Sequence, residues 1–326
     1  MNRESYLKKI SARSGSDHTV GNYKTALNHF DQYLEEYDLD ESELDTDNIY
    51  TLYSYFDDLG IAGSTIKQYL GCIEKYVRDV VEEDVADEIN EFTFNTQSLT
   101  EAKTSTKTPI LEKKHYVLLR NSADDTRSEL IIQLLWETGI RPSELVKIEI
   151  DDIDREEQMI EIETSKIPID SNRKRTREVP YSIEMRSTLR EWLDYGHRAR
   201  YKTASRSDYL LVTENATQMT SNYVNTIVLD VAEKADIKYA YKETEEDSTN
   251  SKKNQYFPNA RHFRNSFATY RIWNGMDLET LRSMMGHHDV SVTAKYVKEQ
   301  SETIKEKNER FRPKTSDLKT ELVKRS

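Results

Sequence analysis

The chain has 326 residues and carries 47 Lys and Arg against 59 Asp and Glu, which gives a net charge of −12 at pH 7. This length favours two domains over one, and no apolar run approaches the roughly 18 residues that cross a bilayer. We therefore expect a soluble, cytoplasmic protein with no membrane partner. Its single cysteine, Cys72, excludes an internal disulfide and a thiolate metal site, and we expect it to fill space in a core.

The acidic balance by itself argues against a nucleic-acid partner, because a DNA-binding chain is expected to be basic. Phosphate contacts need only a local basic patch, however, and not a basic total. Acidic surfaces are also typical of proteins from a very salty cytoplasm. A halophilic, haloarchaeal source is thus a hypothesis, and it predicts that folding and activity require molar salt.

The first hundred residues predict a compact, all-α domain of about four helices. In Thr19–Tyr37 the apolar residues recur at steps of three and four, which gives one apolar helix face. Further helices are predicted at Asp47–Leu59 and after Gly63, where Ser64 is the expected N-cap. Residues 101–110 lie in a stretch rich in Thr, Ser and Lys, which lacks the apolar density of a core and predicts a linker.

Residues 111–300 predict a second domain that is mainly helical with a small β-sheet, and residues 301–326 form a charged tail. Two alternating runs, Met159–Thr164 and Thr176–Tyr181, predict the strands of a hairpin around a polar loop. A second polar loop is predicted at Tyr241–Gln255. The predicted helices are Lys113–Asn121, Arg127–Thr138, Ile183–Tyr195, Asn222–Ala235, Ala260–Asn274, Asp277–Met285 and Val290–Gln300.

The segment ETGIRPSELVKIEIDDID, residues 137–154, places an arginine in a turn between two helices. Gly139 ends the first helix and Pro142 opens the next, so the Arg141 guanidinium can point into a cleft. Glu144 lies one turn further on and can orient it. An Arg and a Glu three residues apart are, by themselves, more often a surface pair on a helix.

The segment ARHFRNSFATYRIWNGMDLETLRSMMGHHDVSVTAKYV, residues 260–297, holds a second group of polar residues. Arg261 and Arg264 lie one helical turn apart and reach the same side. The residues expected to face the core are Phe263, Phe267, Ala268 and Ile272. Gly275 is expected to end this helix.

These spacings resemble the signature of the tyrosine recombinase, or phage integrase, family. Eleven residues separate Arg264 from Gly275 and Gly275 from Gly286, His287 follows, and Tyr296 comes nine residues later. The earlier segment resembles the family's TGLRxSEL box through residues 138–145. The N-terminal helices resemble its SAM-like core-binding domain over residues 1–100. Two ordered boxes with matching internal spacing are a specific signal.

The resemblance implies a site-specific recombinase or integrase that cleaves and rejoins DNA through a covalent 3'-phosphotyrosine intermediate. Tyr296 would be the nucleophile, and Arg141 and Arg264 would stabilise the charge that develops on the phosphate oxygens. His287 would position the phosphate or assist deprotonation of the tyrosine. The phosphotyrosine conserves the bond energy, so no cofactor and no metal is implied.

The polar loop between the two predicted strands, together with the start of the second strand, carries the remaining basic candidates. Lys166, just after the first strand, best matches the family's catalytic lysine, the general acid, and Lys174 is the second choice. Arg173, Lys174, Arg175 and Arg177 form a basic cluster that is either a solvated loop or, beside the proposed lysine, a DNA backbone contact.

One position departs from the family pattern. Arg261 stands where the family usually has histidine, with His262 one residue later, and Asn265 stands where a second histidine is usual. Arginine can donate to phosphate but cannot act as a base at neutral pH, which puts a proton-transfer role for this position in doubt. His287 and His288 lack a spaced third ligand, so a phosphate or structural role is favoured over a metal site.

The partner implied is double-stranded DNA, with a homotetramer on two synapsed sites and accessory DNA-bending proteins. Two alternatives share parts of this pattern. A type IB-like topoisomerase would use the same chemistry on one duplex, and a degenerate DNA-binding protein would not cleave. Integration, excision and dimer resolution, with cleavage in cis or in trans, are all compatible with the motifs.

Overall fold

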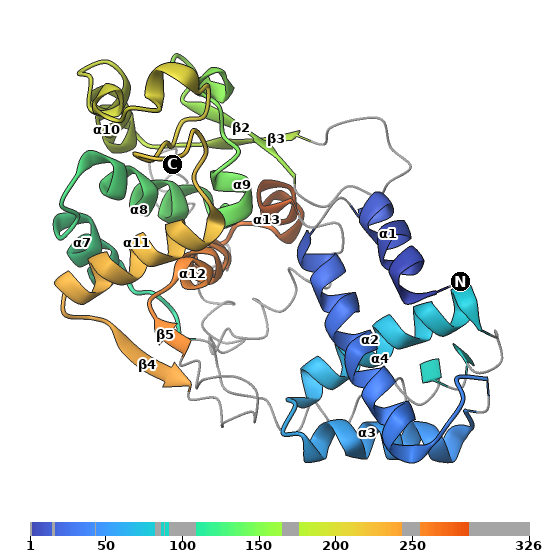
Figure 1. Ribbon diagram of the computed structural model, residues 1–326. Coiled ribbons are helices and arrows are strands. Elements are labelled where there is room, and N and C mark those ends of the chain that lie inside the picture. Colours follow the sequence, from blue (N-terminus) through green and yellow to red (C-terminus); the bar gives the residue numbers. More distant parts are fainter. Residues whose placement is uncertain are drawn as a thin grey trace, which may run out of the picture. The chain divides into compact units, whose positions relative to one another are not determined.

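The structure is a computed structural model that describes residues 2–14, 17–42, 44–81, 86–87, 89–90, 109–164, 176–242 and 255–286. Within these ranges the chain divides into two compact units (Figure 1). The first contains the described residues up to 109 together with strands β4 (Tyr239–Lys242) and β5 (Gln255–Phe257), which pair antiparallel. The second contains the other described residues from 110 onward.

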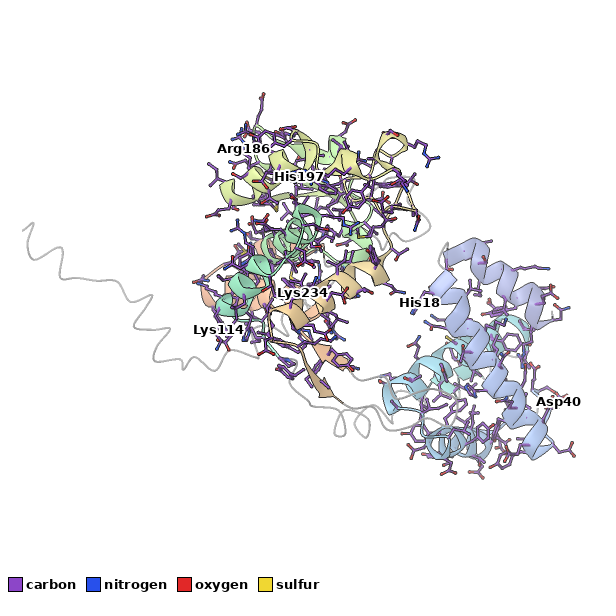
Figure 2. The ribbon with its side chains drawn as sticks, turned by 60° about the vertical axis from the view of Figure 1, so that its left-hand side comes forward. His18, Asp40, Lys114, Arg186, His197 and Lys234 are labelled. Atoms are coloured by element: carbon purple, nitrogen blue, oxygen red, sulfur yellow. The ribbon has the colours of Figure 1, made fainter. Side chains whose placement is uncertain are left out.

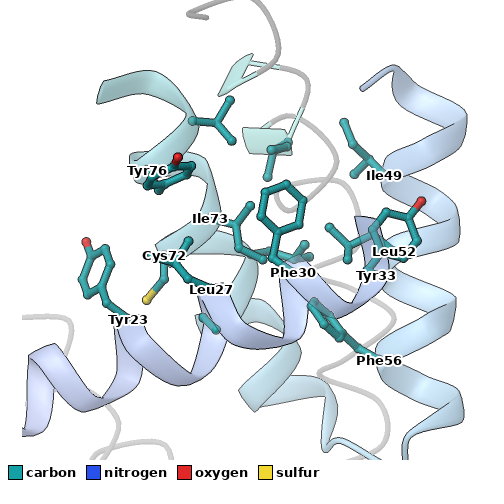
Figure 3. Close-up of a cluster of buried hydrophobic side chains, with 14 of the residues drawn as sticks. Tyr23, Leu27, Phe30, Tyr33, Ile49, Leu52, Phe56, Cys72, Ile73 and Tyr76 are labelled. Atoms are coloured by element: carbon teal, nitrogen blue, oxygen red, sulfur yellow. The ribbon is translucent and has the colours of Figure 1, made fainter. Parts of the chain in front are cut away.

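Four helices can be given bounds among the described residues of the first unit. They are α1 (Arg3–Ser14), α2 (Asp17–Tyr37), α3 (Thr46–Asp58) and α4 (Gly63–Val80). α2 packs against the other three helices, and its side chains Phe30 and Tyr33 are fully buried among them (Figure 3). Cys72 is also buried in this core, as predicted. Ser64 is not the N-cap of α4, because the helix already begins at Gly63, after Ala62.

The second unit has one central helix, α8 (Thr126–Thr138), around which the others pack. Its Leu130, Ile131, Leu134 and Leu135 are fully buried, which explains an apolar stretch without a polar face. Four of the longer helices contact it: α7 (Lys113–Asn121), α10 (Ile183–Leu193), α11 (Ser221–Lys234) and α12 (Ala260–Trp273). Two shorter ones are α9 (Pro142–Leu145), which also contacts α8, and α13 (Leu278–Met285), which packs on α12. Charged side chains such as Arg186 and Lys234 project from the exposed faces of α10 and α11 (Figure 2).

A small antiparallel sheet lies beside these helices in the order β1 (Ile153–Asp154), β2 (Met159–Glu163) and β3 (Thr176–Pro180). Ile160 faces Val179 across the β2–β3 pair, and both are fully buried. The alternation of apolar and polar residues that predicted the hairpin arises because one face of the sheet is buried against the helices.

The predicted fold class is confirmed: the chain is mainly helical with a small sheet. Most predicted elements match the observed ones within two residues at each end. The predicted helix at Val290–Gln300, the linker except for its last two residues, nearly all of the Tyr241–Gln255 loop and the tail lie outside the described residues. Among the described helices, none combines the length and the apolar character needed to cross a bilayer.

Gly139, at the end of α8, is expected to tolerate no side chain. Its φ is +59°, and an added Cβ would lie 2.5 Å from the Phe267 ring of α12. Gly139→Ala should therefore lower the free energy of unfolding by about 3 kcal/mol, from backbone strain plus overpacking. Urea denaturation measures the change. Gly196→Ala is the matched control, because φ there is +80° but nothing lies within 4 Å; equal losses in the two variants would contradict the packing account.

Candidate active site

Arg141 lies in the turn between α8 and α9, as predicted. Gly139 adopts the left-handed conformation that ends α8, and Pro142 opens α9 with Arg141 as its N-cap residue. Glu144 then reaches back: its Oε1 accepts from Arg141 Nη1 at 2.9 Å, and its Oε2 accepts from the Arg141 backbone N–H at 3.1 Å. Because Glu144 is only 1% exposed, the pair is not a surface ion pair. The Arg141 side chain is 29% exposed and can still meet a ligand.

Arg177 on β3 shares the same carboxylate. Its Nη2 donates to Glu144 Oε2 at 2.8 Å, and its Nε donates to the backbone carbonyl of Met284 at 2.7 Å. The sequence suggested a DNA backbone contact for this arginine, but its side chain is buried and bonded inside the protein. Burial alone would raise the pKa of Glu144, but the hydrogen bond and charge of Arg177, with Arg141, lower it overall.

Arg264 on α12 links the turn between α8 and α9 to the end of α13. Its Nη1 donates to the Gly139 carbonyl at 2.7 Å and its Nη2 to the Met285 carbonyl at 2.8 Å. Gly286, in the left-handed conformation with φ +63°, follows as the C-cap of α13. The guanidinium thus holds together two segments that are over a hundred residues apart in the chain.

The two residues at the departure from the family pattern have different environments. Arg261 is exposed on the first turn of α12, whereas His262 is fully buried. His262 Nδ1 accepts the backbone N–H of Asn259 at 3.1 Å, which makes it part of the helix cap. His262 is therefore a structural residue within the described chain, and it does not substitute for the missing histidine at position 261.

Several of the predicted site residues lie outside the described residues. They are Lys166, Arg173, Lys174, Arg175, His287 and Tyr296. The described chain does reach their borders, since Thr164 lies two residues before Lys166 and Gly286 directly precedes His287. No group of three His, Cys, Asp or Glu side chains that could hold a metal occurs in the part of the chain that the structure describes.

The site thus has one arginine in a turn, held by a buried glutamate, and a second arginine bonded to the same turn. Comparison with protein families agrees with this arrangement. The sequence model of the phage integrase family matches residues 110–303, and that of the phage integrase SAM-like domain matches residues 4–94. The chain belongs to the phage integrase family. It is an enzyme of the tyrosine recombinase class, which cuts and rejoins DNA strands.

Similar proteins span at least 90% of the chain. The tyrosine recombinase XerD of Staphylococcus haemolyticus is 24% identical over 322 residues, which cover 95% of this chain and 98% of that protein. The tyrosine recombinase XerC of Staphylococcus aureus (strain bovine RF122 / ET3-1) is 23% identical over 303 residues, 90% of each chain. These relatives do not favour the topoisomerase or the non-cleaving alternative.

Solved structures show the same fold. The Tn1549 transposon integrase in complex with transposon right end DNA has a TM-score of 0.66 at 18% identity, over 94% of this chain and 98% of that chain. The XerH site-specific recombinase bound to palindromic difH substrate also has a TM-score of 0.66, at 21% identity, over 90% of this chain and 80% of that chain. At these identities the likeness establishes the architecture of this integrase-family chain.

Sequence reasoning missed Arg271, which bonds the end of α8 just before the turn that carries Arg141. It lies seven residues after Arg264, two helical turns along one face of α12. Its Nη2 donates to the Glu137 carbonyl at 2.9 Å, and its guanidinium stacks 3.4 Å from the centre of the Phe267 ring. Burial lowers the pKa of Arg271 to about 10, which leaves it charged at neutral pH. Arg264 and Arg271 thus both fix the last carbonyls of α8, and their i,i+7 spacing was the available signal.

The buried His262 predicts a loss of stability in mild acid. Burial, with the nearby charge of Arg261, lowers its pKa from 6.5 to about 4. The neutral ring therefore stabilises the fold fully above pH 6.5, and this contribution, at most about 3 kcal/mol, is lost as the pH falls toward 4. Urea unfolding at several pH values measures it. His262→Asn keeps an acceptor for Asn259 without titrating, so it should show a shallower fall between pH 6.5 and 4; identical slopes would contradict the assignment.

Proposed function

We propose that Tyr296 attacks a DNA phosphodiester while Arg141 and Arg264 bind its two non-bridging oxygens. As the tyrosine oxygen adds to phosphorus, negative charge grows on these oxygens, and fixed guanidinium groups stabilise it more than the ground state. The observation that supports this is the shared turn: Arg264 binds the Gly139 carbonyl, and Arg141 extends two residues later under the control of Glu144. Both guanidinium groups are thus held before DNA arrives.

The proton transfers fall to residues around this pair. The Tyr296 hydroxyl loses its proton as the tyrosyl–phosphorus bond forms, and the phosphorus–5'-oxygen bond breaks to leave a 3'-phosphotyrosine and a 5'-hydroxyl. We assign Lys166, with Lys174 as second choice, to protonate the leaving 5'-oxygen, and His287 to position the phosphate or accept the tyrosine proton. Arg261 is assigned a phosphate contact without proton transfer, because arginine stays charged at neutral pH.

DNA also needs a contact with the first unit, whose sequence is strongly acidic. Residues 1–109 contain 10 Lys and Arg against 22 Asp and Glu, so this region accounts for the whole net charge of −12. The described cations include Arg13, Lys75 and Arg78, which line one hollow with Tyr6, Tyr23 and Asp79 between α1, α2 and α4. Local basic patches suffice for phosphate contacts, and we assign the contact of this unit with the DNA backbone to that hollow.

The assembled form is assigned from the family. Among the solved structures of similar fold, a lambda integrase is described as a dimer on a core site and as a tetramer on a Holliday junction. We infer a homotetramer of this chain on two synapsed duplexes, in the cytoplasm, with accessory DNA-bending proteins as further partners. Arg173, Lys174 and Arg175 are then assigned to DNA backbone contacts.

Covalent capture tests the proposal and identifies the target site in the same experiment. The full chain is incubated with sheared DNA from its source genome, the reaction is quenched with detergent, and protein-linked DNA is retained on a filter and sequenced. We expect one recurrent cleavage position, with DNA linked through its 3' end. Recovery of no linked DNA, although the same chain binds the fragments, would contradict the cleavage chemistry.

A further inference from the structure

Arg177 lies where three parts of the second unit meet. It comes from β3, on the face of the strand that also carries the buried Val179. One end of its guanidinium donates to Glu144 Oε2 at 2.8 Å, and its Nε donates to the Met284 carbonyl at 2.7 Å. A single side chain thus connects the carboxylate that orients Arg141 with the last turn of α13.

The third part is the end of β2, close to the proposed catalytic lysine. Arg177 Nη1 lies 3.5 Å from Thr164 Oγ1, a long contact just after β2, two residues before Lys166. The same Nη1 lies against Gly286: a Cβ added to that glycine would be only 3.0 Å away. Gly286 directly precedes His287, so Arg177 contacts the chain immediately before one predicted catalytic residue and two residues before another.

The chemistry of the site suits an arginine whose role is internal. A planar guanidinium donates in several fixed directions at once, which lets it hold a carboxylate and a carbonyl in one geometry. Arg177 is 9% exposed and its charge is balanced by Glu144, which is 1% exposed. All three guanidinium nitrogens of Arg177 already have acceptors inside the protein, in Glu144, the Met284 carbonyl and, at 3.5 Å, Thr164. The Arg141 side chain on the other side of the same carboxylate is 29% exposed.

We propose that Arg177 is a positioning residue for DNA cleavage, which fixes Arg141, through Glu144, relative to the end of α13 and hence to His287. The inference rests on the proposed function, in which Arg141 binds the phosphate and His287 follows α13. The sequence suggested that Arg177 contacts the DNA backbone, and the inference gives it instead a role inside the protein, in which it holds Glu144 and the end of α13. Arg177 does not touch the DNA.

The test separates the rate of cleavage from the strength of DNA binding. Arg177→Met, which keeps the length of the side chain but none of its donors, is assayed with the duplex recovered by covalent capture. We expect single-turnover formation of the covalent complex to slow about 10²-fold, the effect of a small misplacement of reacting groups. The Kd for the duplex, and the slope of its logarithm against the logarithm of salt concentration, should stay at the wild-type values.

Two further variants test whether the effect is specific to the guanidinium of Arg177. Arg177→Lys keeps a charge next to Glu144 but cannot bond the Met284 carbonyl in the same geometry, so it should recover part of the lost rate. Arg155→Met is the matched control, because Arg155 is a half-exposed arginine near the same sheet that pairs with Asp194. It should cleave at the wild-type rate. Thermal unfolding of each variant reports whether the fold is retained.

Each outcome is decisive. An unchanged cleavage rate in Arg177→Met overturns the inference, as does a weaker Kd with a salt slope reduced by about 0.9, which would report a lost phosphate contact. If Arg177→Met does not fold, Gly286→Ala displaces the same guanidinium from the other side and should slow cleavage with the Kd retained; cleavage at the wild-type rate would overturn the inference. Failure of the wild-type chain to form covalent complex contradicts the proposed function instead.

Discussion

Replacement of Arg264 by lysine is expected to lower the rate of DNA cleavage by about 10²- to 10³-fold, the loss typical of one donor to a developing negative charge. Lysine keeps the positive charge but has no planar fork. It cannot hold the Gly139 and Met285 carbonyls in the observed arrangement and also present a donor to phosphate. The variant therefore separates charge from geometry at this position.

Single-turnover formation of covalent complex, at DNA concentrations well above the Kd, measures this loss. Arg190→Lys is the control, because Arg190 is an exposed arginine near the end of α10, and it should leave the rate unchanged. A cleavage rate in Arg264→Lys within a few-fold of the wild type would show that charge alone is enough and that the two-carbonyl geometry has no part in cleavage.

Replacement of Glu144 by alanine is expected to lower the free energy of unfolding by about 3–5 kcal/mol, because it leaves the buried Arg177 without its carboxylate. Arg141 loses the same partner and the bond to its backbone N–H, so cleavage should also be lost. Urea unfolding at pH 7 measures the first effect, and covalent complex formation in the folded fraction measures the second.

The lowered pKa of Glu144 gives this prediction a pH signature. A carboxylate with a depressed pKa stabilises the fold above its unfolded pKa and loses that contribution as the pH falls below it. The difference in stability between the wild type and Glu144→Ala should therefore be largest at neutral pH and shrink in acid. Glu163→Ala is the control, because that carboxylate is half exposed on β2 with a weak 3.6 Å pair to Lys147. Equal effects of the two substitutions would contradict a special role for the buried carboxylate.

Helix positions followed from periodicity wherever a helix has one apolar and one polar face, as in α2, α10 and α11. α1 was missed because only Tyr6 and Ile10 are buried on it, too few to give a repeating pattern. The start of α9 followed from Pro142, whereas β1, only 2 residues long, is held by tertiary contacts that no local pattern reports.

The site was predictable where its residues lie in the two local motifs, residues 137–154 and 260–297. Arg141 in its turn and Glu144 behind it followed from glycine and proline signals. The burial of Arg177 was not predicted, because the basic residues next to it indicated a solvated loop. Strand alternation was the available signal, since it places Arg177 on the same face as the buried Val179. Which carbonyls Arg264 binds depends on how α8 and α13 pack, and that is a property of the folded chain alone.

The central claim is that Tyr296 becomes covalently linked to the 3' phosphate of cleaved DNA. The most direct measurement is to digest the captured complex with nuclease and protease and identify the modified peptide by mass spectrometry. We expect the nucleotide on the peptide that contains Tyr296, a free 5'-hydroxyl on the released strand, and no adduct in Tyr296→Phe, whereas Tyr195→Phe, at an exposed tyrosine, should form adduct normally. A nucleotide on any other residue, or an adduct that persists in Tyr296→Phe, would contradict the account.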